Sequence, residues 1–249
     1  MERYRSYRSV TARKGLVSFE TSCKETDLHI QADTNLEKDA AAWVIEARIS
    51  IEEYARNNPG FLESFAPLPV DAFAPPVVRD MMESAEVAGV GPMAAVAGAI
   101  ACHVGTRCVE RTSGEVIVEN GGDIFLWLKQ PVTIAIWAGS SPLSGRIGIR
   151  VAASAGPLGI CTSSGTVGHS RSLGTSDAAT VVSESVALAD AVATATGNIV
   201  RRSDDLDHAL EKVQDIPGIL ACVIVKGKKL GIWGNIELVP LKMARKKFV

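Results

Sequence analysis

The strongest constraint on the fold is a series of closely spaced β-rich segments in the second half of the chain. Residues 115–119, 124–128, 132–137 and 147–151 are rich in β-branched and aromatic side chains, and short connections separate them. Such neighbours pair antiparallel, because a parallel crossover needs a dozen or more residues. Further strands are predicted at 178–183, 220–225 and 230–233, the last two as a hairpin.

The remaining segments predict a second hairpin and several helices. Residues 15–32 alternate apolar and polar around a Lys24-Glu25 turn, and Thr34 with Glu37 forms a capping box that opens a helix to about Asn57. Further helices are expected at 77–87, 92–104, 186–196 and 204–214.

Strands interrupted by helices, without strict alternation, indicate an α+β fold of antiparallel sheets packed with helices. We expect one compact unit over residues 1–249, with the basic segments 1–14 and 241–249 at its periphery and helices 35–57 and 92–104 on the same sheet system.

Charge and composition narrow the function classes. The net charge is −2, with net positive charge at the two ends and net negative charge between them, so a continuous nucleic-acid-binding face is not expected. No apolar run approaches the roughly 20 residues of a membrane span, and the first residues lack the apolar region of a secretory signal. Five cysteines without a Cys-x-x-Cys pair argue against a disulfide framework or a cysteine-rich zinc site. We expect a cytoplasmic protein with a small-molecule ligand, without nucleic-acid or membrane partners, and compatible with a homodimer.

Residues 158–198 carry the densest chemistry. Gly165 lies among the hydroxyl side chains of Thr162, Ser163 and Ser164, and His169 follows. Glycines allow close approach of the backbone, and a histidine titrates near neutral pH. Ser163, Ser164 and His169 are therefore the candidate catalytic residues, and Thr162 and Gly165 are candidate contacts to a ligand.

Two further patterns could complete a site. Asp190 and Thr194 share one face of the predicted helix, where their oxygens suit Mg²⁺; a solvated helix face is the alternative. The turn Asn120-Gly121-Gly122-Asp123 offers bare backbone and a carboxylate, although tight turns use the same residues for conformation alone.

The Ala-rich helix after Gly91 has two interpretations. Its free N–H groups could bind a phosphate, with Met93 near the ligand, or its small residues could serve close helix packing, which we favour. Cys161 as a nucleophile with His169 as its base is a weaker alternative, since nothing nearby in the sequence lowers the pKa of the thiol.

Three blocks in this order carry a family resemblance: VENGGDIFL at 118–126, CTSSGTVGHS at 161–170 and ALADAVATATGN at 187–198. The chain resembles an uncharacterised family related to ApbE, the FAD:protein FMN transferases, whose fold is related to the T-fold. The resemblance implies that Gly121, Gly122 and Asp123 lie against a flavin nucleotide. It also implies that Asp190 and Thr194 hold Mg²⁺, and that residues 162–165 form a Thr-Ser-Gly turn with His169 downstream.

The chain also departs from ApbE. The residues after His169 differ from the ApbE segment, and no lysine stands near Gly91. The expected function is therefore the binding of a phosphate-bearing small molecule, FAD or FMN in the first place, with Mg²⁺, as a possible flavin or nucleotidyl transferase. The alternatives are an accessory role in sulfur metabolism, such as sulfide-dependent homocysteine formation, and a non-catalytic assembly role.

Overall fold

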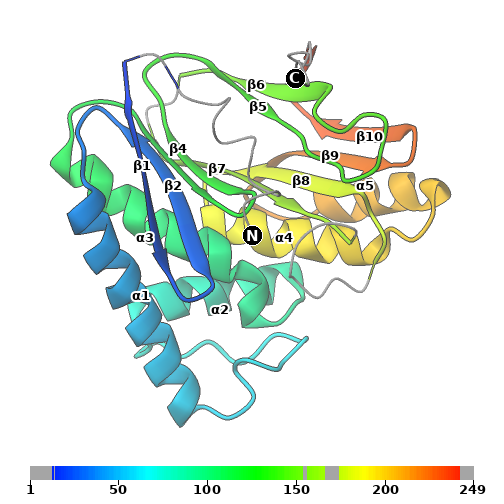
Figure 1. Ribbon diagram of the computed structural model, residues 1–249. Coiled ribbons are helices and arrows are strands. Elements are labelled where there is room, and N and C mark those ends of the chain that lie inside the picture. Colours follow the sequence, from blue (N-terminus) through cyan, green and yellow to red (C-terminus); the bar gives the residue numbers. More distant parts are fainter. Residues whose placement is uncertain (1–12, 14, 154–155, 166–173, 242–249) are drawn as a thin grey trace.

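The computed structural model describes residues 13, 15–153, 156–165 and 174–241, and its main element is an eight-stranded sheet. All neighbouring strands pair antiparallel, in the order β1-β2-β3-β4-β7-β8-β9-β10 (Figure 1). The strands are β1 (Val17–Cys23), β2 (Thr26–Ala32), β3 (Val116–Asn120), β4 (Asp123–Trp127), β7 (Leu158–Ser163), β8 (Ala178–Ser183), β9 (Ile219–Lys226) and β10 (Lys229–Gly234). The α+β fold with antiparallel sheets is confirmed.

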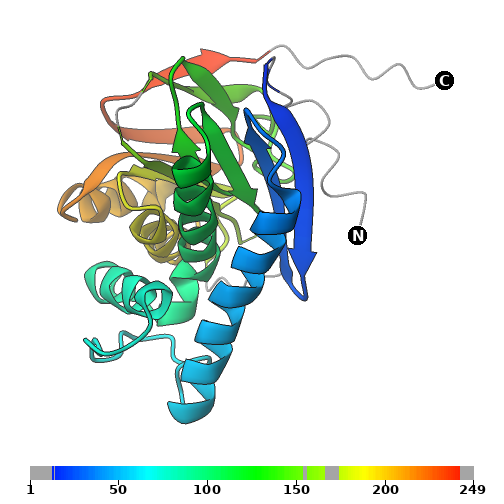
Figure 2. The ribbon, with the colours of Figure 1, turned by 90° about the vertical axis from the view of Figure 1, so that its left-hand side faces the viewer.

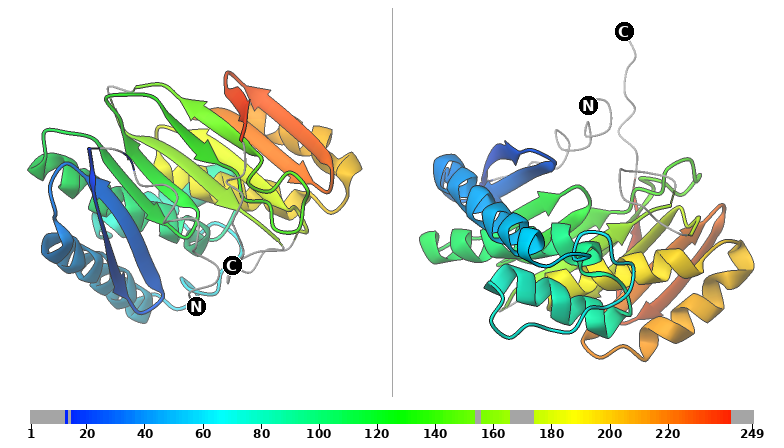
Figure 3. Two further views of the ribbon diagram at one scale, coloured as in Figure 1. Left: turned by 45° about the horizontal axis from the view of Figure 1, so that its top comes forward. Right: turned by 90° about the horizontal axis from the view of Figure 1, so that it is seen from below.

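A second, three-stranded sheet and a layer of helices cover the two faces of the main sheet (Figures 1 and 2). The small sheet has the order β11-β6-β5. Helices lie against the other face of the main sheet, as the view from below shows (Figure 3, right). The strands of the small sheet are β5 (Val132–Ala135), β6 (Ile147–Val151) and β11 (Glu237–Pro240). The helices are α1 (Glu37–Asn57), α2 (Pro76–Ala88), α3 (Val96–Arg111), α4 (Val186–Ile199) and α5 (Leu206–Gln214), with a 3-10 helix, η3 (Pro92–Ala95), before α3 and another, η4 (Ser203–Asp205), before α5.

Alternation along the strands decides which side chains meet which layer. On β2, Leu28 and Ile30 join the core under the helices, and so does Phe125 of β4. Leu126 of β4 points the other way, into the core between the two sheets. A third cluster of buried side chains lies among α1, α2, α3 and α4, so α2 forms an outer layer. Helices α1 and α3 both pack on the main sheet, as expected.

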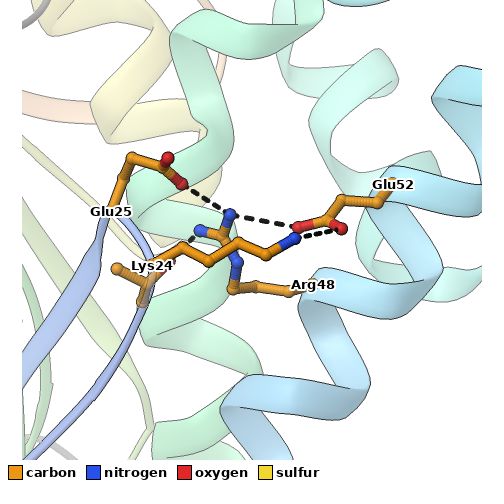
Figure 4. Close-up of polar contacts among 5 residues, drawn as sticks. Lys24, Glu25, Arg48 and Glu52 are labelled. Atoms are coloured by element: carbon orange, nitrogen blue, oxygen red, sulfur yellow. Dashed lines mark hydrogen bonds and ion pairs between the residues drawn. The ribbon is translucent and has the colours of Figure 1, made fainter.

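The hairpin of β1 and β2 is fixed to α1 by charge pairs (Figure 4). Arg48 of α1 binds Glu25 at the turn at 2.6 Å and Glu52 at 3.1 Å, and it donates to the Thr26 hydroxyl at 2.8 Å. Lys24 binds Glu52 at 2.7 Å from the other side. The side chain of Arg48 is largely covered, whereas exposed pairs alone contribute little, so the network mainly orients the hairpin on the helix.

Several predicted boundaries are wrong in detail. Helix α1 begins at Glu37 without a side-chain cap from Thr34; instead Asn35 Oδ1 accepts a hydrogen bond from the Glu37 N–H at 2.9 Å. The Ala-rich helix begins as η3 and continues to Arg111, seven residues beyond the expected end. The sequence analysis did not predict strands β7 and β11. The sequence of β7, LGICTS, is rich in small and hydroxyl residues and becomes a strand only between β4 and β8.

Contrary to the expectation from the sequence, one helical segment in the described part of the chain has the length and composition of a membrane span. The segment comprises residues 92–111, and half of its apolar stretch is buried inside the protein. Gly98, Ala101 and Cys108 of α3 are among its buried residues, and the helix packs against α1, α4 and the sheet. The segment therefore has the packing of a core helix.

Gly105 provides a test of the helix–sheet contact. A Cβ at this position would lie 2.3 Å from the buried ring of Phe125, whereas a Cβ at Gly156 would meet nothing within 4 Å. We expect Gly105→Ala to lower the free energy of unfolding by about 1–3 kcal/mol through overpacking, although alanine favours a helix. Gly156→Ala should stay within about 0.5 kcal/mol of the wild type in urea unfolding. Equal stability of the two variants would contradict the close contact.

Candidate active site

Two buried carboxylates, one on the main sheet and one on a helix, lie between the sheet and the helical layer. Asp123 begins β4, and because Phe125 two residues later faces the helices, Asp123 faces them too. Asp190 lies in the middle of α4, which packs on β4 and β7. Each of the two residues is only 8% exposed. The chain thus brings two acidic groups, 67 residues apart in sequence, into one buried region.

Burial shifts the titration of both carboxyl groups. Burial first, and then the charge of Asp190, raises the pKa of Asp123 well above its ordinary value. Burial raises the pKa of Asp190 to about 7, although backbone N–H groups of Ala97 and Gly98 act in the opposite direction. Two carboxylates that share a buried site cannot both ionise cheaply, so the raised pKa values favour a proton on the pair near neutral pH.

The start of α3 supplies the direct partner of Asp190. The Gly98 N–H donates to Asp190 Oδ2 at 2.8 Å. A Cβ on Gly98 would lie 2.6 Å from the Val186 carbonyl oxygen and 2.8 Å from the Asp190 Cβ, so only glycine allows this approach of α3 to α4. Close helix packing, the favoured interpretation of the Ala-rich helix, is what the structure has at Gly98. The N–H groups that Asp190 uses are those of Ala97 and Gly98, beyond the helix start at Gly91 that was considered for a phosphate.

The turn between β3 and β4 lies beside the carboxylate pair. Gly121 and Gly122 have φ values of 68° and 120°, which side-chain-bearing residues rarely adopt. The Asn120 side chain donates to the Ala97 carbonyl oxygen at 3.0 Å and so ties the turn to α3. The Gly122 carbonyl oxygen accepts from the Thr162 N–H at 3.2 Å, which ties the turn to β7. The glycines thus serve the conformation of the turn, and the turn fixes the position of Asp123.

Cys161 lies directly opposite Asp123 in the pairing of β4 with β7. The thiol is buried, donates to the Val186 carbonyl oxygen at 3.4 Å, and has a pKa raised well above its ordinary value by burial and by the charge of Asp123. A nucleophilic cysteine needs the opposite shift, toward the thiolate. The structure therefore argues against Cys161 as a nucleophile.

The hydroxyl side chains of residues 162–164 do not form one group. The Thr162 hydroxyl bonds to the Thr180 hydroxyl at 2.9 Å on the face covered by the small sheet, so this side chain points away from Asp123. Ser163 faces the helices and lies near Gly197 at the end of α4. Ser164 is half-buried.

Gly165 serves contacts within the chain. A Cβ there would lie 2.4 Å from the Gly174 carbonyl oxygen, and the Gly165 N–H donates to the Ser176 carbonyl oxygen at 2.9 Å.

The remaining predicted site residues lie in different places. Thr194 is half-buried, one turn beyond Asp190 on the same stripe of α4. Met93 of η3 packs against the cluster of apolar side chains among α1, α2, α3 and α4. His169 lies outside the described residues. Sequence reasoning missed Gly98 and Ala97 as partners of the site; the signal was a glycine inside a helix of small residues.

The raised pKa values predict how stability depends on pH. A folded-state pKa above the unfolded value of about 3.9 means that the folded protein binds more protons, so the stabilising effect is present below pH 4 and is lost as pH rises toward 7. Asp190→Asn removes this dependence. Without divalent cations, we expect the variant to exceed the wild type in free energy of unfolding by about 1–3 kcal/mol at pH 8, and the difference to vanish near pH 4. Urea unfolding in EDTA at both pH values measures it, and parallel pH profiles would contradict it.

Comparison with solved structures shows which fold this is. The flavinyl transferase ApbE of Pseudomonas stutzeri in its apo form superposes with a TM-score of 0.54 at 13% identity, over 88% of this chain and 94% of that chain. The flavin transferase ApbE of Vibrio cholerae gives 0.52 at 12% identity, over 88% and 96%. The fold is therefore that of ApbE.

Relatives at higher identity cover most of the chain. A UPF0280 protein of Methanocaldococcus jannaschii is 42% identical over 87% of this chain and 90% of its own length. A UPF0280 protein of Methanothrix thermoacetophila is 39% identical over 84% and 87%. The family model described as AbpE bacteria matches residues 8–225. The chain belongs to this uncharacterised, ApbE-related family.

Proposed function

We propose that the protein binds a flavin nucleotide together with a divalent cation and acts as a transferase of the ApbE type. The observation that carries this proposal is the buried pair Asp123 and Asp190, next to a glycine turn and the start of α3. The names of the structural neighbours, flavinyl and flavin transferases, support the choice of ligand.

The donor set fits a hard cation. Asp123 and Asp190 offer carboxylate oxygens, and Thr194 adds a hydroxyl on the same stripe of α4. Mg²⁺ prefers such oxygens and keeps positions for water and for substrate phosphates. Bound there, the cation would neutralise the two carboxylates and the charge of a phosphate group. No thiolate or imidazole is needed from the described part of the chain.

The residues around the pair have distinct tasks in this proposal. Asp190 accepts from the Gly98 N–H through Oδ2, which orients the carboxylate that would hold the cation. Asn120 fixes the glycine turn to α3, so the exposed backbone at Gly121 keeps its place for a phosphate. Asp123 completes the carboxylate pair from the sheet side. His169 remains the proposed group for moving a proton.

Calorimetric titration with FAD, with and without Mg²⁺, tests the proposal. We expect FAD binding that requires Mg²⁺, and a loss of about 1–3 kcal/mol, which is roughly 5–150-fold in Kd, for Asp123→Asn and for Asp190→Asn. Asp80→Asn is the matched control, because Asp80 of α2 is half-buried and also has a pKa raised to about 6, by burial and by Glu83, but lies outside the pair.

FMN and ATP titrations separate the possible ligands. Binding of ATP but not of FAD would replace the flavin by an adenine nucleotide while keeping the cation site. Loss of binding in Asp80→Asn equal to that in Asp190→Asn would mean that the pair acts through stability alone. Failure of all three nucleotides to bind in the presence of Mg²⁺ would refute the proposal.

A further inference from the structure

A second group of reactive side chains lies on the opposite face of the main sheet. It consists of Ser18 on β1, His29 on β2 and Glu119 on β3, three neighbouring strands (Figure 1). Leu28 and Ile30 on either side of His29 face the helices, so His29 faces the other way. Val118 also faces the helices, so Glu119 next to it faces the same way as His29. This group is therefore separated by the sheet from Asp123 and Asp190.

Across the three strands the residues follow the order hydroxyl, imidazole, carboxylate. Ser18 Oγ lies 2.6 Å from His29 Nε2. His29 and Glu119 are directly opposite each other in the antiparallel pairing of β2 with β3. Side chains in that relation have Cβ atoms about 4.5–5.5 Å apart, within reach of an imidazole–carboxylate hydrogen bond. Glu119 is itself oriented, since its Oε1 accepts from the Gly122 N–H at 3.1 Å.

Burial separates the roles of the three residues. His29 and Glu119 are each 6% exposed, whereas Ser18 is exposed at the edge strand of the sheet. A base that is shielded from water keeps its partner and orientation, and a nucleophile must be reachable by its substrate. Two carboxylates are directly opposite His29, Glu20 on β1 and Glu119 on β3. Glu20 is exposed and Glu119 is buried, so Glu119 is the one shielded from water beside the imidazole.

We propose that Ser18 is the nucleophile of a second reactive site, with His29 as its general base and Glu119 as the group that orients the imidazole. The substrate class is a small carboxylic ester. Ser18 Oγ bonds to the carbonyl carbon while its proton passes to His29 Nε2, and the ester C–O bond breaks as the alcohol leaves with that proton. Water then cleaves the acyl-serine by the same route, releasing the carboxylate and restoring Ser18.

Labelling with a fluorophosphonate probe, located by peptide mass spectrometry, tests the proposal on the full-length protein. Ser22 is the matched control, because it is an exposed serine on the same strand and the same face, with Asp27 and no histidine opposite it. We expect the adduct on Ser18 and none on Ser22. Ser18→Ala should abolish labelling and the release of p-nitrophenol from p-nitrophenyl acetate, and Ser22→Ala should change neither.

The base and its partner are tested by rates. His29→Gln should slow labelling of Ser18 by about 100-fold or more, the usual contribution of a general base. Glu119→Gln keeps an oxygen for the Gly122 N–H and should cause a smaller loss. Far-UV circular dichroism verifies folding, and if His29→Gln does not fold, the comparison of Ser18 with Ser22 in the wild type decides. No adduct on Ser18, equal adducts on both serines, or an unchanged rate in a folded His29→Gln would overturn the proposal.

Discussion

The contact between Asp190 and the backbone of Gly98 determines how the helical layer meets the sheet. It joins the middle of α4 to the first turn of α3, and the lack of a side chain at Gly98 lets the two helices approach. A buried carboxylate without partners costs several kcal/mol, so the N–H donors at the start of α3 are what make its position tolerable. The glycine turn and β7 are then attached around the same point through Asn120 and Thr162.

The same contact satisfies only part of the charge. Asp123 brings a second carboxyl group into the region from the sheet side, and the pKa values of both groups are raised. This arrangement lowers the stability of the fold, since apolar residues of the same size would pack there without the cost of burying charge. Perturbed carboxyl groups of this kind are typical of sites that bind a cation or handle protons. The fold thus keeps two buried carboxyl groups with raised pKa values at the place where the segments that resemble ApbE come together.

The main sheet separates two chemical environments. Its helix-facing side holds Asp123 and Cys161 beside α4, where desolvation raises the pKa values of both groups. Its other side is apolar under the small sheet but polar along β1, β2 and β3, where His29 and Glu119 lie. The turn at Gly122 connects the sides, because its backbone N–H bonds to Glu119 while Asp123 follows it in sequence.

The sequence by itself determined the antiparallel α+β fold, because short connections leave no room for parallel crossovers. It also determined the positions of most helices, and through local spacing and glycine content it marked Asp190 and the turn 120–123 as candidate site residues. It could not determine that β7 is a strand, because LGICTS acquires this structure only between β4 and β8. Nor could it show that the Thr162 hydroxyl turns to the face opposite Asp123, since strand register decides the face. The pairing of Asp123 with Asp190, and of His29 with Glu119, joins residues 67 and 90 positions apart, and only tertiary packing brings such residues together.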